Sequence, residues 1–148
     1  MRRATIVLVV EDDAAIRNLI LEALRSEGYD ADGAADAPDA LASIRKRRPD
    51  LIITDYHLPV TDGLEFLRTL RLEGYGDVPA LVVSADSRPP DLPVTSFISK
   101  PFDLEAIIRA VRRALGSPAS GDEAKQSNRL IGPAFASLLL PRPRSFAT

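Results

Sequence analysis

Short apolar segments recur through the first 116 residues, and polar residues or turn signals separate them. Residues 5–10, 51–54 and 80–83 are runs of aliphatic, largely β-branched side chains, which are typical of parallel strands buried on both faces. Residues 97–99 form a shorter strand candidate, and residues 30–34 form a weak one. The pattern therefore predicts five strands.

The segments between these strands have the apolar spacing of amphipathic helices. The first helix should begin near Asp12 or Asp13 and end at Gly28. Its expected buried stripe is Ile16, Leu19, Ile20, Ala23 and Leu24. Three more helices should begin near Asp36, Asp62 and Asp103 and end before Pro49, near Glu73 and at Gly116. Alternating strands and helices predict an α/β fold, a doubly wound five-stranded parallel sheet.

Composition and charge restrict the class of protein. With 148 residues, 45% hydrophobic and 27% charged, the chain has the size and balance of one globular domain. The net charge of −2 gives no reason to expect a nucleic acid or a membrane as a partner, and the basic run Arg45–Arg48 is interpreted as a solvated helix end. The apolar run Ile6–Val10 is too short for a signal peptide or a membrane span, so a cytoplasmic protein is expected.

The composition changes after Gly116. Residues 117–128 have the small and polar composition of a flexible linker. Residues 130–140 are apolar, but Gly132 and Pro133 interrupt them and no periodicity is visible. We therefore expect a folded domain over residues 4–116 and a flexible tail over residues 117–148.

Polar residues follow the strands where the strands would share one edge of the sheet. Glu11 and Asp12 follow the first strand, and Asp55, Ser84 and Lys100 follow the third, fourth and fifth. The carboxyl ends of parallel strands meet at one edge, so carboxylates should lie close together there and need a cation between them. Oxygen ligands in a chain without Cys favour Mg²⁺ over zinc. This set suits phosphoryl transfer, in which an Asp can be the nucleophile.

At these strand ends the sequence resembles a known family, the receiver domains of bacterial two-component response regulators. The motifs that carry the resemblance are Val9–Asp13, Thr54–Pro59 with Asp62-Gly63, Val82–Ala85 and Phe97–Phe102. The resemblance covers residues 4–116 and implies the strand order 2-1-3-4-5.

The resemblance also implies a role for each residue of the set. Asp55 is then the phosphoacceptor, and Mg²⁺ is the cofactor. The implied metal ligands are Glu11, Asp12, Asp55 and the backbone carbonyl of His57. Ser84 and Lys100 would contact the phosphoryl group, and Phe97 would be the switch aromatic.

One segment departs from the family pattern. The interval between Ser84 and Lys100 is several residues short and contains Pro89, Pro90 and Pro93. Three prolines in so short a span exclude a regular helix of any length, so the fourth helix of the family should be shortened or missing here.

The resemblance implies a single-domain response regulator rather than an enzyme. A histidine kinase or a histidine phosphotransfer protein would phosphorylate Asp55, and an unidentified downstream protein would bind one of two conformations. The alternative is a receiver-like scaffold that works without phosphorylation. A phosphohydrolase of the class that uses an aspartyl phosphate is disfavoured, because it would need an acid at position 57, which is His. A DNA-binding transcription regulator is also disfavoured, because the 32 residues after Gly116 contain no helix-turn-helix pattern.

Overall fold

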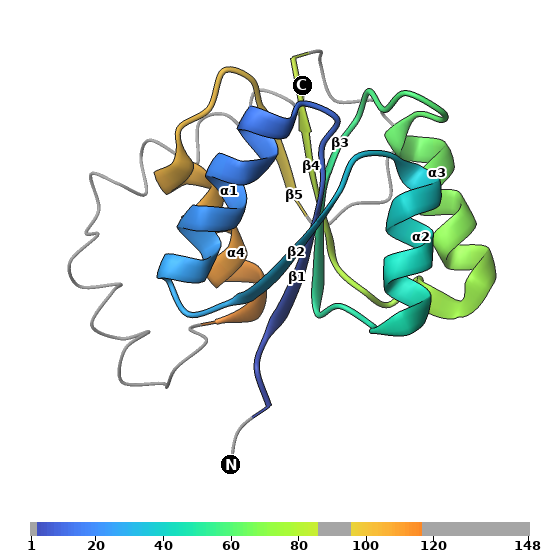
Figure 1. Ribbon diagram of the computed structural model, residues 1–148, viewed down its shortest axis with the longest axis horizontal. Coiled ribbons are helices and arrows are strands. Elements are labelled where there is room, and N and C mark those ends of the chain that lie inside the picture. The colour runs from blue at the N-terminus through green and yellow to red at the C-terminus, as the bar shows by residue number, and fades with distance from the viewer. Residues whose placement is uncertain (1–2, 86–95, 117–148) are drawn as a thin grey trace.

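The computed structural model describes residues 3–85 and 96–116. In this part of the chain, five parallel strands form one sheet in the order β2-β1-β3-β4-β5 (Figure 1). The strands are β1 (Ile6–Val10), β2 (Asp30–Ala34), β3 (Leu51–Asp55), β4 (Ala80–Ser84) and β5 (Ser96–Ser99). The helices are α1 (Ala14–Ser26), α2 (Ala37–Lys46), α3 (Gly63–Leu70) and α4 (Leu104–Leu115), and a π-helical turn, η1 (Arg71–Tyr75), follows α3. The predicted fold class and strand order are confirmed, including the weak strand at residues 30–34.

Helices cover both faces of the sheet, α1 and α4 on one side and α2 and α3 on the other (Figure 1). Alternate residues of β1 serve the two layers: Val7 and Val9 pack in the cluster with α1 and α4, whereas Leu8 and Val10 pack in the cluster with α2 and α3. Because every side chain of β1 is buried on one face or the other, this strand is continuously apolar instead of alternating.

An aspartate caps the N-terminus of each described α-helix. The side chains of Asp13, Asp36, Asp62 and Asp103 each accept a hydrogen bond from the backbone N–H three residues later. Such caps satisfy donors that the helix itself cannot pair, and the negative charge suits the positive end of the helix dipole. Of the two candidates for the first helix, Asp13 is the cap, so Asp12 is not needed there.

The predicted buried stripe of α1 was wrong in one position. Leu19 is 54% exposed, whereas Leu21, which the stripe omitted, is 6% exposed. The reason lies in β2, because Gly33 has no side chain and leaves room on the sheet for Leu21. A methyl group at Gly33 would lie 3.0 Å from Leu21 Cδ1, so the helix turns Leu21 toward the sheet and Leu19 toward solvent.

Glycine ends α1 as predicted. Gly28 has φ of 96°, the left-handed conformation that an L side chain rarely adopts. Its N–H donates to Arg25 O, and the N–H of Tyr29 donates to Leu24 O, both at 3.1 Å, which is the Schellman arrangement. The helix expected to reach about Glu73 instead ends at Leu70 and continues as η1.

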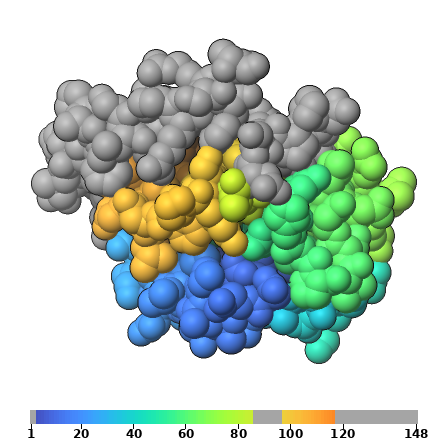
Figure 2. Space-filling model, turned by 90° about the horizontal axis from the view of Figure 1, so that it is seen from above, coloured from blue at the N-terminus to red at the C-terminus, as the bar shows by residue number. Residues whose placement is uncertain are grey.

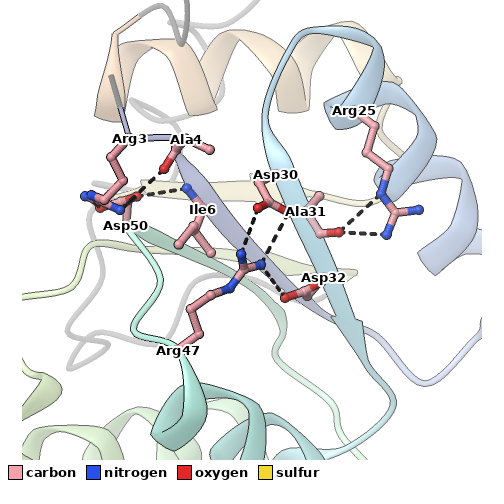
Figure 3. Close-up of polar contacts among 9 residues, drawn as sticks. All are labelled: Arg3, Ala4, Ile6, Arg25, Asp30, Ala31, Asp32, Arg47 and Asp50. Atoms are coloured by element: carbon pink, nitrogen blue, oxygen red, sulfur yellow. Dashed lines mark hydrogen bonds and ion pairs between the residues drawn. The ribbon is translucent and has the colours of Figure 1, made fainter. Parts of the chain in front are cut away.

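Ion pairs neutralise most of the basic run Arg45–Arg48. Arg47 binds both Asp30 and Asp32 of β2 at 2.7 Å, as Figure 3 shows. Arg45 pairs with Glu73, and Arg48 pairs with Asp77. Paired guanidinium groups are poorly suited to hold phosphates, which supports the interpretation of this run as a helix end rather than a nucleic-acid site.

Two predictions lie outside the described residues. The shortened or missing fourth helix falls on residues 86–95, and the flexible tail falls on residues 117–148. Within the described ranges, no helix combines the length and the apolar character needed to cross a membrane.

Deletion of residues 121–148 should leave the fold intact, because the small and polar composition that begins at Ser117 is typical of a flexible linker rather than of a packed segment. We expect the midpoint of thermal unfolding, measured by circular dichroism, to equal that of the full chain. A midpoint lower by more than about 5 °C, roughly 1 kcal/mol for a domain of this size, would show instead that residues 130–140 pack on the domain.

Candidate functional site

The strands bring the predicted site residues to one edge of the sheet. Glu11 follows β1, Asp55 ends β3, Ser84 ends β4 and Lys100 follows β5. The strands are in parallel register, with Asp55 beside Val83 and Ser84 beside Ser99. In the space-filling view, the segments after β1 (blue), β3 (green) and β5 (yellow to orange) adjoin near the centre of the molecule (Figure 2).

Three carboxylates form the centre of this edge. Glu11, Asp12 and Asp55 each offer an oxygen atom, and these atoms all lie within 4.8 Å of one another. Glu11 is 4% exposed and Asp55 is 7% exposed, whereas Asp12 is exposed at the rim. The sequence prediction that acids converge here is confirmed.

Lys100 lies against two of these acids. Its Nζ is 2.7 Å from Asp55 Oδ2 and 3.6 Å from Glu11 Oε1. Burial lowers the pKa of Lys100, but the hydrogen bond to Asp55 and the charges of Asp55 and Glu11 outweigh burial, so its pKa lies above the usual value. The ammonium group therefore stays charged and offsets one negative charge of the acidic cluster.

The single positive charge of Lys100 does not balance the negative charges of Glu11, Asp12 and Asp55. Burial, reinforced by the negative charge of Asp55, raises the pKa of Glu11 to about 7. A carboxyl group whose negative form is this unfavourable is one that a divalent cation would stabilise strongly.

Backbone N–H groups hold the two buried carboxylates in place. The N–H of His57 donates to Asp55 Oδ1 at 3.1 Å, and the N–H of Asp13 donates to Glu11 Oε2, also at 3.1 Å. Asp55 thus has a donor on each oxygen, His57 N–H on one and Lys100 on the other. The metal-ligand role of the His57 carbonyl stays a prediction.

Ser84 and Phe97 are both buried side chains of the last two strands. Ser84 is 0% exposed, and its carbonyl accepts a hydrogen bond from the N–H of Lys100 at 2.8 Å. Phe97 is 7% exposed and belongs to the core cluster on the side of α2 and α3. Their roles as switch hydroxyl and switch aromatic stay predictions.

Gly63 supports the loop after Asp55, a contact that sequence patterns did not indicate. Its N–H donates to the carbonyl of Tyr56. A Cβ atom at Gly63 would lie 2.9 Å from Tyr56 Cα and 3.0 Å from Asp55 O, which is too close for any side chain. The first residue of α3 therefore packs directly on the backbone that carries Asp55, and the Asp-Gly pair serves both as a helix cap and as this contact.

Arg17 is a second contact that sequence patterns did not indicate. It lies in the first turns of α1, and its Nη1 donates to the carbonyl of Glu11 at 2.7 Å. Periodicity places Arg17 outside the buried stripe of the helix, and no pattern in a single sequence shows which way its guanidinium points.

An apolar cavity of about 570 Å³ opens beside Lys100. Its walls come from α1 and from the start of α4 and the loop before it. The lining residues are Ile16, Leu19, Ile20, Ala85, Lys100, Pro101, Phe102 and Leu104. The exposed side chain of Leu19 thus has an apolar setting, next to the acidic site.

The donor set fits Mg²⁺. The three converging groups are all carboxylates, the hard oxygen ligands that Mg²⁺ prefers, and the chain has no Cys and one His. Glu11, Asp12 and Asp55 are the side chains that could hold the ion. Carboxylates, a lysine and a hydroxyl around Mg²⁺ are the groups that stabilise a phosphoryl group during transfer.

Curated proteins with similar sequences are response regulators. The chain is 38% identical over 130 residues to the response regulator MprA of Mycobacterium sp. (strain KMS), a match that covers 84% of this chain and 56% of that protein. It is 37% identical over 135 residues to the alkaline phosphatase synthesis transcriptional regulatory protein SphR of Synechococcus elongatus, covering 78% and 52%. The chain thus spans about half the length of these relatives.

Solved structures show the same fold. Chemotaxis protein CheY4 of Vibrio cholerae superimposes with a TM-score of 0.72 at 32% identity, covering 76% of this chain and 100% of that one. Response regulator TrrA of Thermotoga maritima, solved in complex with Mg²⁺ and BeF, superimposes with a TM-score of 0.68 at 30% identity, covering 75% and 99%.

The family model of the response regulator receiver domain matches residues 7–112, which include every residue of the acidic site. Fold, strand order and sequence relatives agree with this match. The chain therefore belongs to the response regulator receiver domains, the phosphoacceptor modules of two-component systems.

Proposed function

We propose that this chain is a phosphorylation-controlled receiver whose phosphoacceptor is Asp55. The observation that carries the proposal is the setting of the Asp55 carboxylate, which is buried, 2.7 Å from Lys100 Nζ, and within 4.8 Å of oxygen atoms from two more acids. A purely structural Asp at a strand end needs neither the lysine nor the acidic neighbours.

In this proposal Mg²⁺ is held by Glu11, Asp12, Asp55 and the backbone carbonyl of His57. When bound, the ion offsets negative charge on the phosphoryl oxygens. The raised pKa of Glu11 supports a cation at this position, because a nearby positive charge would favour the ionised carboxylate.

The phosphoryl donor is a phosphohistidine of a histidine kinase or a histidine phosphotransfer protein. An oxygen of the Asp55 carboxylate forms a bond to phosphorus while the bond between phosphorus and the donor's imidazole nitrogen breaks. The electron pair of that bond stays on the imidazole, and Asp55 becomes an acyl phosphate. Lys100, which now binds Asp55 Oδ2, is close enough to pair with an oxygen of the new phosphoryl group.

The acyl phosphate is proposed to select one of two conformations. Ser84 would donate its hydroxyl hydrogen to the phosphoryl group, and the ring of Phe97 would move with it. The burial of both side chains supports this coupling, because a buried ring cannot shift without moving its neighbours. A downstream protein would then bind the selected conformation.

The output is proposed to pass through a partner protein in the cytoplasm, not through DNA or a membrane. Relatives include a probable transcriptional regulatory protein, TcrX of Mycobacterium tuberculosis, which is about twice as long as the matched region. In this chain the folded domain is proposed to be residues 4–116, and residues 117–148 a flexible tail without a helix-turn-helix pattern.

The alternative function is a receiver-like scaffold that takes no phosphate. No described contact favours it, since the acids and the lysine are both present and adjacent. It differs from the main proposal in one measurable outcome, the chemical state of Asp55 after exposure to a phosphodonor.

Incubation with acetyl phosphate and Mg²⁺ should add one phosphoryl group to the wild-type chain, because, within the described residues, Asp55 is the one carboxylate to which the Lys100 ammonium donates a hydrogen bond. Asp55→Asn should abolish the addition, measured as intact mass. Asp13→Asn is the matched control, since Asp13 caps α1, and it should still be labelled. Labelling of the Asp55→Asn chain would refute the assignment, and an unlabelled wild type would favour the scaffold.

Asp12→Ala should weaken Mg²⁺ binding about 10-fold or more, measured by isothermal titration calorimetry, because it removes a ligand from the cluster. Without Mg²⁺ its thermal stability should be unchanged or higher, since the mutation also relieves repulsion between carboxylates.

Asp13→Ala gives the opposite pattern and serves as the control for Asp12→Ala. It removes the cap of α1, so it should lower stability by about 1 kcal/mol and leave Mg²⁺ affinity nearly unchanged. A large loss of stability in Asp12→Ala, measured without Mg²⁺, would mean that Asp12 is structural.

A further inference from the structure

Arg17 breaks a local rule of helix design. Its backbone N–H bonds to Asp13 O, the carbonyl of the N-cap residue, so Arg17 completes the first turn of α1. A positive side chain is unfavourable there, because the helix dipole is positive at this end. Residues that break such rules without a local benefit often serve a site elsewhere.

Gly33 breaks a second rule in the strand that Arg17 crosses. Glycine weakens the interior of a strand, and Gly33 lies within β2, paired in register with Val9. A Cβ atom at Gly33 would lie 3.0 Å from Arg17 Cδ and 3.3 Å from Arg17 Cγ. Because Gly33 has no side chain, the aliphatic part of Arg17 can pack against the β2 backbone as it extends from α1 toward Glu11.

The guanidinium group of Arg17 binds the backbone of Glu11, a residue of the acidic cluster. Arg17 Nη1 donates to the carbonyl oxygen of Glu11 at 2.7 Å, and the N–H of Glu11 donates to Ala34 O at 3.0 Å. The N–H of Asp13 donates to the Glu11 carboxylate. The peptide groups on both sides of Glu11 are therefore held, one by β2 and the other by Arg17.

The hydrogen bonds that hold Glu11 oppose the electrostatic repulsion between the three carboxylates. The oxygen atoms of Glu11, Asp12 and Asp55 lie within 4.8 Å of one another, and mutual repulsion favours any movement of the loop after β1 that separates them. A loop free to move in this way would have to be reordered each time a cation bound, which costs affinity.

We propose that Arg17 is a positioning residue of the cation site, which keeps the loop after β1 in the geometry that brings Glu11 and Asp12 to Asp55. Gly33 is part of the same device, because it admits the Arg17 side chain. The inference rests on the proposed function, since it assumes that the three carboxylates bind Mg²⁺.

The direction of the change in Mg²⁺ affinity distinguishes a positioning role of Arg17 from an effect of its charge. Replacement of Arg17 by Ala removes a positive charge near the acids, which by itself would tighten the binding of a cation. Loss of positioning would weaken binding. Gly33→Val tests the same contact without a change of charge, because its side chain would occupy the path of Arg17.

The control is Arg25, on the same helix. Its guanidinium also donates to a backbone carbonyl of β2, that of Ala31 at 2.7 Å, and Figure 3 shows this contact. Arg25→Ala therefore removes an arginine, a positive charge and a link between α1 and β2, but no contact with Glu11.

The test is a Mg²⁺ titration of the full-length chain by calorimetry. Arg17→Ala should weaken binding about 10-fold, or about 1.4 kcal/mol, Gly33→Val should weaken it in the same direction, and Arg25→Ala should stay within about twofold of wild type. Hydrogen exchange of the Asp13 amide, measured without Mg²⁺, should be faster in Arg17→Ala and Gly33→Val and unchanged in Arg25→Ala.

Unchanged or tighter Mg²⁺ binding by Arg17→Ala overturns the inference and leaves the proposed function intact. Equal weakening by Arg25→Ala also overturns it, because the effect would then come from the general packing of α1 on β2. A wild-type chain that binds no Mg²⁺ contradicts the proposed function itself, and the inference falls with it.

Discussion

Repulsion between buried carboxylates is the constraint on which the rest of this structure depends. Glu11 and Asp55 are almost fully enclosed, and their oxygens lie within 4.8 Å of each other and of Asp12. Hydrophobic burial in two helix layers supplies the free energy that holds the strand ends together against this repulsion. Lys100 and two backbone N–H groups then offset part of the charge, and the remaining negative charge would favour a cation at this site.

The fold and the membership of the acidic site could be predicted because both follow from periodicity and chain order. Continuous apolar runs indicate doubly covered strands, and the residue after each run must lie at the carboxyl edge of a parallel sheet. Convergence of Glu11, Asp55 and Lys100 needed no knowledge of side-chain directions. The cap role of Asp13 was also predictable in type, although only the structure separates it from Asp12.

Side-chain paths could not be predicted in the same way. The burial of Leu21 in place of Leu19 depends on the space above Gly33, which belongs to a different segment of the chain. Two other contacts also depend on tertiary structure: the hydrogen bond from Arg17 to the Glu11 carbonyl, and the close packing of Gly63 on the Asp55 backbone. Each involves a residue whose local pattern is ordinary or slightly unfavourable, and whose benefit appears only across elements.

The hydrogen bond from Arg25 to the Ala31 carbonyl affects the edge of the sheet at β2. Among the described strands, β2 pairs only with β1. Backbone groups alternate in direction along a strand, so the carbonyl of Ala31 points away from β1, since Asp30 and Ala34, one and three residues away, bond toward it. An open strand edge with free acceptors can recruit a strand from another molecule and so begin aggregation. Arg25 occupies this acceptor at the second residue of β2, and the ion pairs of Asp30 and Asp32 with Arg47 place charged side chains beside it. A strand from another molecule could bond to the Ala31 carbonyl only after breaking the Arg25 contact, so the helix that lies beside the acidic site also protects this part of the sheet edge.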